Sequence, residues 1–237
     1  MNYGNIYLIH LRYILSILGI LKILKTISWI FKKEYEKKYS EAIFKNIEND
    51  FHIWDVGANK GYYIKKFLKI NKGISVIAFE PTPYLYKFLK YKFLTLIKNK
   101  KLFVYNYALA DKSKKTFFWV SKEKKKSYTN SLSYHPNKIK IPVNQKKPDE
   151  LITNKKLKIP NLIKLDIEGG ELKFLEGSKK ILKYKALRHL FIEVHFAELN
   201  KLHGKNGVTK IIKILKNSDF KIFWTDSSHL HAKKIYK

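Results

Sequence analysis

From Phe51 onward, short apolar runs alternate along the chain with stretches whose apolar residues recur at helical spacing. The apolar runs predict strands at residues 51–56, 74–79, 101–107, 162–167, 188–194 and 220–225. The stretches between them predict helices at residues 60–70, 84–98, 171–183 and 208–217. The tail through Ile235 predicts a last edge strand. This alternation predicts an α/β, Rossmann-like domain, with a mostly parallel sheet of seven strands and helices on both faces.

Residues 112–147 interrupt this alternation. Thr116–Val120 and Lys138–Val143 predict two short strands, and Ser121–Asn137 between them is polar and rich in lysine. We predict a basic insertion that forms a lid over a substrate site. A solvated surface excursion is the alternative.

The N-terminal segment has a different pattern. On a helix over residues 6–31, the apolar residues share one face, while the longest uncharged run, between Arg12 and Lys22, is too short to cross a bilayer. The helix either caps the core or a subunit interface, or lies as a basic amphipathic helix on an anionic membrane surface. We therefore divide the chain into a helical extension, residues 1–48, and a domain, residues 49–237. We expect a cytoplasmic protein, with a peripheral position on a membrane as the alternative.

Charge and composition narrow the possible chemistry. The net charge is +30, from 49 Lys and Arg against 19 Asp and Glu, which favours polyanionic partners. However, only two arginines occur, Arg12 and Arg188, and arginine is the preferred residue for bidentate contacts with phosphates and bases. Nucleic acid is therefore not the expected main substrate. The absence of cysteine excludes disulfides, thiolate zinc sites and a cysteine nucleophile.

The most informative motif is Asp55-Val-Gly-Ala-Asn-Lys-Gly61, where an apolar strand runs into a turn with two glycines and then a helix. The glycine spacing is neither that of a dinucleotide fingerprint nor that of a phosphate loop, and a carboxylate precedes the first glycine. A pyrophosphate disfavours a nearby carboxylate. S-adenosylmethionine (SAM) carries a cationic sulfonium and an amino group, so Asp55 favours SAM.

Two further strand ends support a nucleoside cofactor. Glu80 ends the second predicted strand, where a carboxylate can accept hydrogen bonds from ribose hydroxyls. The segment Asn106–Asp111 ends the third, where the adenine would lie. The predicted cofactor-binding residues are Asp55, Gly57, Ala58, Asn59, Gly61, Glu80, Asn106, Ala108 and Asp166.

Five motifs together resemble the FkbM-type methyltransferases. In order, they are residues 55–61, Ala78-Phe-Glu-Pro-Thr-Pro83, residues 106–111, Leu162-Ile-Lys-Leu-Asp-Ile-Glu-Gly-Gly-Glu171 and Ile192-Glu-Val-His195. They cover roughly residues 50–225, and the D-x-E-G-x-E block is the most specific. Gly170 stands where the family usually has alanine, and Tyr63 replaces a usual small hydroxyl residue. The resemblance implies a SAM-dependent methyltransferase fold and methylation of an oxygen, often on a sugar or natural-product hydroxyl.

A hydroxyl acceptor needs a base for its proton, and the ends of the later strands offer candidates. We predict three catalytic residues, with Asp166 near the cofactor and the reacting centre, and His195 or Glu168 as general base. The alternatives are a turn-stabilising role for Asp166 and an orienting role for His195. Asp166 and Glu168 alone are too few ligands to assign a metal. His229 and His231 are expected to be a surface pair.

The expected acceptor is a glycan or a small hydroxylated molecule. The alternative is an RNA ribose 2′-O-methyltransferase, motivated by the net charge of +30. The sequence lacks both an Asn/Asp-Pro-Pro-aromatic motif and the cysteine used for attack on pyrimidine rings, which argues against methylation of bases. A SAM-binding scaffold without activity is a third, less favoured hypothesis, because the candidate carboxylates are intact.

Overall fold

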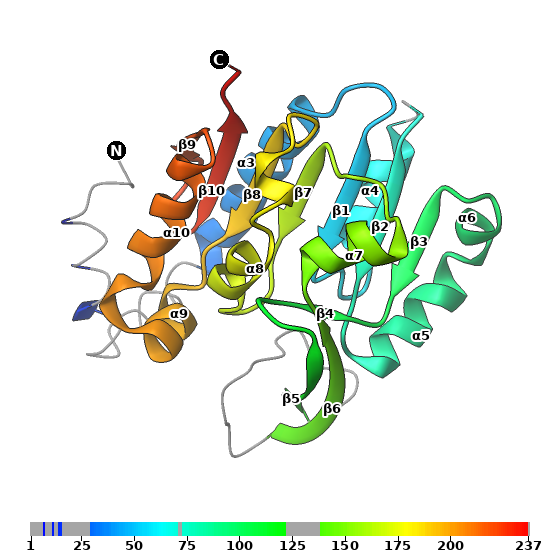
Figure 1. Cartoon of the computed structure of the whole chain (residues 1–237), viewed down its shortest axis with the longest axis horizontal. Coiled ribbons are helices and arrows are strands. Elements are labelled where there is room, and N and C mark those ends of the chain that lie inside the picture. The colour runs from blue at the N-terminus through cyan, green and yellow to red at the C-terminus, as the bar shows by residue number, and fades with distance from the viewer. Residues whose placement is uncertain are drawn as a thin grey trace.

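The computed structural model describes residues 29–70, 73–121 and 138–236, together with residues 7, 11, 14 and 15. Most of the predicted N-terminal helix and nearly all of the polar loop at residues 121–137 lie outside this part. The elements appear in Figure 1 as α3 (Trp29–Lys45), β1 (His52–Val56), α4 (Tyr62–Lys69), β2 (Ser75–Phe79), α5 (Pro83–Lys92), α6 (Leu94–Lys98), β3 (Leu102–Tyr105), β4 (Ala108–Leu109), β5 (Lys114–Ser121), β6 (Lys138–Lys146), α7 (Pro148–Lys155), β7 (Leu162–Leu165), α8 (Glu171–Gly177), η1 (Ile181–Lys183), β8 (His189–Glu193), α9 (Phe196–His203), η2 (Gly204–Asn206), α10 (Gly207–Asn217), β9 (Phe220–Trp224) and β10 (His229–Lys234).

Seven strands form the main sheet, in the order β3-β2-β1-β7-β8-β10-β9. All neighbours from β3 to β8 pair in parallel, and only β10 pairs antiparallel with β8 and β9. This confirms the predicted fold class. The expectation that the last strand lies at the edge is wrong, because β10 lies between β8 and β9. Its residues are buried on both faces, with Leu230 and Ala232 on one and His229 and His231 on the other, as an interior strand requires.

Helices cover both faces of the sheet and enclose two hydrophobic clusters. Side chains of α7, α8 and α10 pack in one cluster, and side chains of α3, α4 and α5 pack in the other. In Figure 1, α7, α8 and α10 lie in front of the sheet, and α3 and α4 lie behind it. Tyr39, Ile43 and Ile47 are buried in the second cluster, so the C-terminal half of α3 and the residues that follow it belong to the core. The division of the chain into an extension and a domain at residue 48 stays a prediction.

Several element boundaries differ from the sequence prediction. The helix predicted over residues 84–98 divides into α5 and α6 at Phe93. The helix predicted over residues 171–183 ends at Gly177, where an added Cβ would lie 2.3 Å from the carbonyl oxygen of Ala110. Helices α7 and α9 were not predicted, because each is short and lies beside a strand with a stronger apolar signal.

The interruption at residues 112–147 contains a second, smaller sheet. Strands β5 and β6 pair antiparallel, and β4 pairs in parallel with β6. The two long strands project from the main sheet (Figure 1). Within the described residues, no helix is long and apolar enough to cross a bilayer.

Gly57, the first residue after β1, fixes the approach of two neighbouring strands. Its φ is +86°, and an added Cβ would lie 1.9 Å from the carbonyl oxygen of Asp166. Gly204 also has a positive φ, +67°, but an added Cβ there meets nothing within 4 Å. Gly57 therefore carries a packing constraint in addition to a backbone one.

We predict that Gly57→Ala destabilises the protein far more than Gly204→Ala. The backbone strain shared by both substitutions costs about 1–3 kcal/mol, and the overlap with Asp166 adds at least about 2 kcal/mol to the cost at Gly57. Urea unfolding of both variants measures the difference. Equal losses of unfolding free energy would contradict the close packing of β1 against β7.

Candidate active site

A cavity opens at the carboxyl ends of β1, β2 and β7. It encloses about 760 Å³ between protein atoms, part of which is open to solvent. Both sheets contribute to the wall, which comprises Val56, Gly57, Asn59, Phe79, Glu80, Pro81, Tyr107, Ala108, Leu109, Ala110, Phe118, Gln145, Asp166, Ile167, Glu168, Gly170 and Lys173. Ligands of open parallel sheets bind at this edge.

Glu80 is a buried carboxylate on the cavity wall. The backbone N–H of Asn59 donates to its Oε2 at 2.8 Å, and the backbone N–H of Thr82 donates to its Oε1 at 2.9 Å. Burial raises the pKa of Glu80, although these hydrogen bonds oppose the shift. Each carboxylate oxygen has two acceptor lone pairs, so Glu80 keeps acceptor capacity for a ligand in the cavity.

The glycine turn after β1 is held by the neighbouring strand. The backbone N–H groups of Gly57 and Ala58 both donate to the carbonyl oxygen of Phe79. Gly57 and Asn59 reach the cavity wall, whereas Ala58 and Gly61 lie outside it. At Gly61, an added Cβ would lie 2.4 Å from the ring of Phe93. Gly61 therefore allows close packing of α4 and α5, and its predicted role in cofactor binding stays a prediction.

Asp55 does not line the cavity. Its side chain is fully buried, and its Oδ1 lies 3.6 Å from the Nζ atom of Lys164. The same Nζ atom lies 3.0 Å from Oδ2 of Asp166, so Lys164 joins the ends of β1 and β7. Burial lowers the pKa of Lys164, but Asp166 and Asp55 more than offset this and raise it above its usual value. Sequence analysis missed Lys164, although a lysine inside the apolar run of residues 162–165 was a signal of a buried ion pair.

The third predicted strand end supplies one wall residue and one structural residue. Nδ2 of Asn106 donates to the carbonyl oxygens of Glu80 and Pro81, at 2.8 and 2.9 Å. Asn106 thus fixes the loop after β2 and does not reach the cavity. Ala108 lies on the wall between Tyr107 and Leu109.

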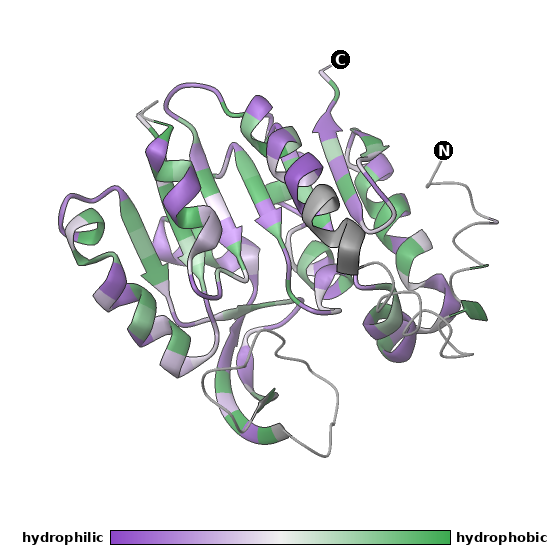
Figure 2. Cartoon of the chain, turned by 180° about the vertical axis from the view of Figure 1, so that it is seen from behind, coloured by the Kyte–Doolittle hydropathy of each residue, from purple (hydrophilic) through white to green (hydrophobic). Residues whose placement is uncertain are grey.

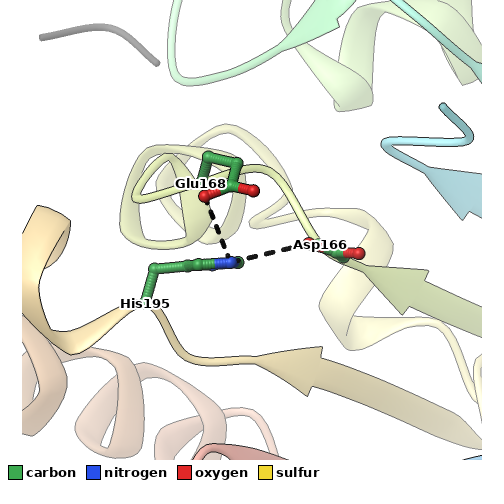
Figure 3. Close-up of side chains that lie close together, drawn as sticks. All are labelled: Asp166, Glu168 and His195. Atoms are coloured by element: carbon green, nitrogen blue, oxygen red, sulfur yellow. Dashed lines mark ion pairs between the residues drawn. The ribbon is translucent and has the colours of Figure 1, made fainter. Parts of the chain in front are cut away.

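Asp166, Glu168 and His195 come together although β7 and β8 deliver them separately (Figure 3). Nε2 of His195 lies 3.4 Å from Oε2 of Glu168 and 3.7 Å from Oδ1 of Asp166. On its other side, Nδ1 of His195 lies 2.8 Å from Oε1 of Glu171, which is completely buried. Glu168 has a left-handed backbone, with φ at +54°, a conformation that is costly for a residue other than glycine.

The charges of this cluster decide its protonation. Burial lowers the pKa of His195, but the carboxylates of Glu171, Glu168 and Asp166 raise it to about 10. Burial raises the pKa of Glu168 to about 7, against the opposing charge of His195. At neutral pH, His195 is therefore an imidazolium, and Glu168 is divided between its protonated and deprotonated forms.

The same three side chains offer three possible ligand atoms for a metal ion, all within 4.8 Å of one another. A cation would bind there only if His195 gave up the proton that the carboxylates stabilise. Because the imidazolium already balances part of their charge, we describe the group as an acid–base cluster.

A second group of titratable residues lies behind the first. Nδ1 of His229 lies 2.8 Å from Oδ2 of Asp226, and Nε2 of His229 lies 3.6 Å from Oε2 of Glu193. Burial raises the pKa of Glu193, but His229 and His195 lower it to about 2. His231 pairs with His189 at 3.0 Å. The expectation of a surface pair at His229 and His231 is wrong, because β10 is an interior strand and both side chains are buried.

The structure thus separates the predicted site residues into three groups. The cavity wall contains Gly57, Asn59, Glu80, Ala108, Asp166 and Glu168. His195 lies behind the wall and contacts it through Glu168 and Asp166. The residues that shape the surroundings are Asp55, Ala58, Gly61 and Asn106. Sequence analysis missed the contributions of Phe118 and Gln145, because only the folding of β5 and β6 brings them to the cavity.

Comparisons with known proteins identify the family of the chain. The model of the methyltransferase FkbM domain family matches residues 55–222. The chain is 24% identical over 197 residues to the hexuronic acid methyltransferase AglP of Haloferax volcanii, a match that covers 79% of this chain and 76% of that protein.

The fold also resembles the crystal structure of methyltransferase FkbM from Methylobacillus flagellatus KT. The TM-score is 0.55 at 17% sequence identity, over 78% of this chain and 44% of that one. The chain therefore spans less than half the length of that protein. Because the family model covers most of the chain and includes the ends of β1, β2, β7 and β8, the chain belongs to the FkbM family of methyltransferases, and SAM dependence follows from that membership.

Proposed function

We propose that the protein transfers a methyl group from SAM to a hydroxyl oxygen of a sugar or a similar hydroxylated acceptor. The observation that carries this proposal is the position of Glu168, which lines the same cavity as Glu80 and contacts a protonated His195. A nucleoside-binding carboxylate and an acid–base group thus face one space. A relative named for methylation of a hexuronic acid supports a sugar as the acceptor.

The cavity wall suits SAM in charge and polarity. Among the residues that the structure describes, three carboxylates line it, Glu80, Asp166 and Glu168, against one cation, Lys173. Such a wall favours a ligand with cationic sulfonium and amino groups. Apolar side chains near Glu80, those of Phe79, Pro81 and Leu109, provide contacts for an adenine. When bound, SAM would supply the electrophilic methyl group.

The chain's own residues would prepare the acceptor. Glu168 takes the proton from the acceptor hydroxyl, since its pKa near 7 leaves part of the carboxylate deprotonated at neutral pH. His195 positions Glu168 and is itself fixed by Glu171. Asp166, held by Lys164, places a negative charge on the wall close to Glu168. This arrangement favours Glu168 over His195 as base, because His195 already carries its proton.

The same wall charge disfavours the RNA alternative. Asp166 and Glu168 beside the reacting position would repel the phosphates that flank a ribose 2′-hydroxyl.

Replacing Glu80 should weaken SAM binding. In Glu80→Gln, an amide nitrogen replaces one acceptor oxygen, and the loss of a hydrogen bond to a charged group raises the SAM dissociation constant about 10- to 100-fold. Isothermal titration measures the effect, with Glu176→Gln as a control for the charge change outside the cavity wall. Unchanged affinity in a Glu80→Gln protein with normal thermal unfolding would rule out Glu80 as a cofactor ligand.

The reaction itself is tested with SAM that carries a deuterated methyl group. We expect the label on an oxygen of a glucuronide or glucoside acceptor, located by mass spectrometry and NMR. Label in RNA, or in no acceptor, would overturn the proposed function.

Glu168→Gln should lower kcat about 10²- to 10⁴-fold, while the dissociation constant of SAM changes little.

The pH profile separates a base from a structural residue. A base must be deprotonated, so kcat/KM of the wild type should rise with pH through about 7 and then level off. Glu168→Gln should lose this rise, whereas Glu176→Gln, on the helix α8 that follows Glu168, should keep it. A rise near pH 7 that persists in Glu168→Gln would assign the base to another group.

A further inference from the structure

Helix α5 carries an apolar stripe on its outer face in addition to the one that packs into the core. Leu85 and Leu89 are buried against the sheet. On the other side, Tyr84, Phe88 and Tyr91 are 50%, 36% and 85% exposed. Their spacing of four and three residues places them on one helix face. Figure 2 shows hydrophobic and hydrophilic residues alternating along this helix at the β3 edge of the sheet. A surface helix needs only one apolar stripe, so the second is not explained by the core.

Tyr62 at the start of α4 is a further exposed aromatic residue, on the helix next to α5. Its ring is 59% exposed, and the Nζ atom of Lys66 lies 4.3 Å from the ring centroid. The two helices are neighbours, because Nζ of Lys92 on α5 donates to the carbonyl oxygen of Lys60. We call Tyr62, Tyr84, Phe88 and Tyr91 and the lysines among them the α5 surface.

The charge around these aromatic rings is positive throughout. Residues 81–110 contain no acidic residue and six lysines, Lys87, Lys90, Lys92, Lys98, Lys100 and Lys101. Within the part of the chain that the structure describes, none of these lysines forms an ion pair with an acidic side chain. The Nζ atom of Lys92 lies 5.3 Å from the ring centroid of Phe88, so the charges and rings are interleaved. Desolvation and the neighbouring Lys65 lower the pKa of Lys92, which fits an uncompensated positive field.

An anionic bilayer explains this combination better than a protein or a nucleic acid. Lysine is depleted at the centre of protein–protein interfaces. Proteins that stack single-stranded nucleic acid on aromatic rings do so in a positively charged groove, whereas this surface is the outer side of a helix. Exposed tyrosines with lysines beside them match the interfacial region of a membrane, where rings enter the headgroup layer and ammonium groups meet anionic lipids.

We propose that the α5 surface binds an anionic lipid bilayer. Pro81 lines the cavity, and α5 begins two residues later at Pro83, so the helix begins close to the cavity wall. Binding would hold the cavity near the membrane, where an acceptor carried on the bilayer can reach it. This contact is separate from the membrane contact predicted for the N-terminal helix, which lies largely outside the described residues.

Vesicle binding by the full chain tests the charge component. We expect co-sedimentation with vesicles of phosphatidylcholine and phosphatidylglycerol at 3:1, and not with phosphatidylcholine alone. Each lysine near an anionic surface contributes about fivefold to affinity, so Lys87→Glu with Lys90→Glu should weaken binding at least 25-fold. Lys179→Glu with Lys183→Glu makes the same change in net charge at exposed lysines beyond α8 and serves as the control. Equal losses in the two double variants would overturn the proposal.

Insertion of the rings needs its own measurement. Brominated lipids in the anionic vesicles should quench the fluorescence of the tryptophan added by Tyr91→Trp. They should not quench the tryptophan added by Tyr184→Trp, at a tyrosine that is 37% exposed. Tyr84→Ser with Tyr91→Ser should lower affinity about tenfold without changing the thermal unfolding temperature. Absence of quenching at position 91, or binding of RNA but not of vesicles through the same lysines, would overturn the proposal. None of these readouts depends on methyl transfer, so the proposed function is tested separately.

Discussion

The proton on His195 allows four carboxylates to share the ends of β7 and β8. Asp166, Glu168, Glu171 and Glu193 all lie within 3.7 Å of this one imidazole ring. Without the positive charge, their mutual repulsion would protonate some of them or separate the two strand ends. Lys164 has the same effect one strand further along, between Asp55 and Asp166. Two buried cations therefore hold the polar centre of the molecule together.

The two cations do not fully compensate the carboxylates, and the remaining negative charge raises the pKa of Glu168. Glu168 lies on the cavity wall, where burial and the other carboxylates raise its pKa while His195 only partly opposes them. A carboxylate with a pKa near 7 is suited to accept a proton from a hydroxyl at neutral pH. Glu193, which does not line the cavity and forms ion pairs with two histidines, has a low pKa and stays ionised. The difference between these two glutamates comes from their partners and not from their residue type.

The molecule keeps opposite charges in different places. Seven of its 19 acidic residues lie at or near the strand ends that surround the cavity, namely Asp55, Glu80, Asp166, Glu168, Glu171, Glu193 and Asp226. Lysines are frequent on the outer surface, and on α5 they lie among exposed aromatic rings. A cationic cofactor in the cavity and an anionic membrane at the outer surface are compatible with this distribution, because water and salt screen the exposed lysines.

The sequence by itself determined the fold class, the family and the carboxylates of the cavity wall. Hydrophobic periodicity specified the strands, and a residue at the end of a parallel strand necessarily faces the ligand-binding edge, so Gly57, Glu80 and Asp166 could be located from order alone. Only the tertiary structure decided what each side chain contacts. Burial on both faces placed β10 inside the sheet and turned His229 from a surface residue into a partner of Glu193. Likewise, the aromatic residues of α5 fit a core stripe by their spacing, and only packing showed that Leu85 and Leu89 occupy the core while Tyr84 and Tyr91 stay outside. Periodicity records which residues share a face of one element, whereas burial and charge depend on which other elements that face meets.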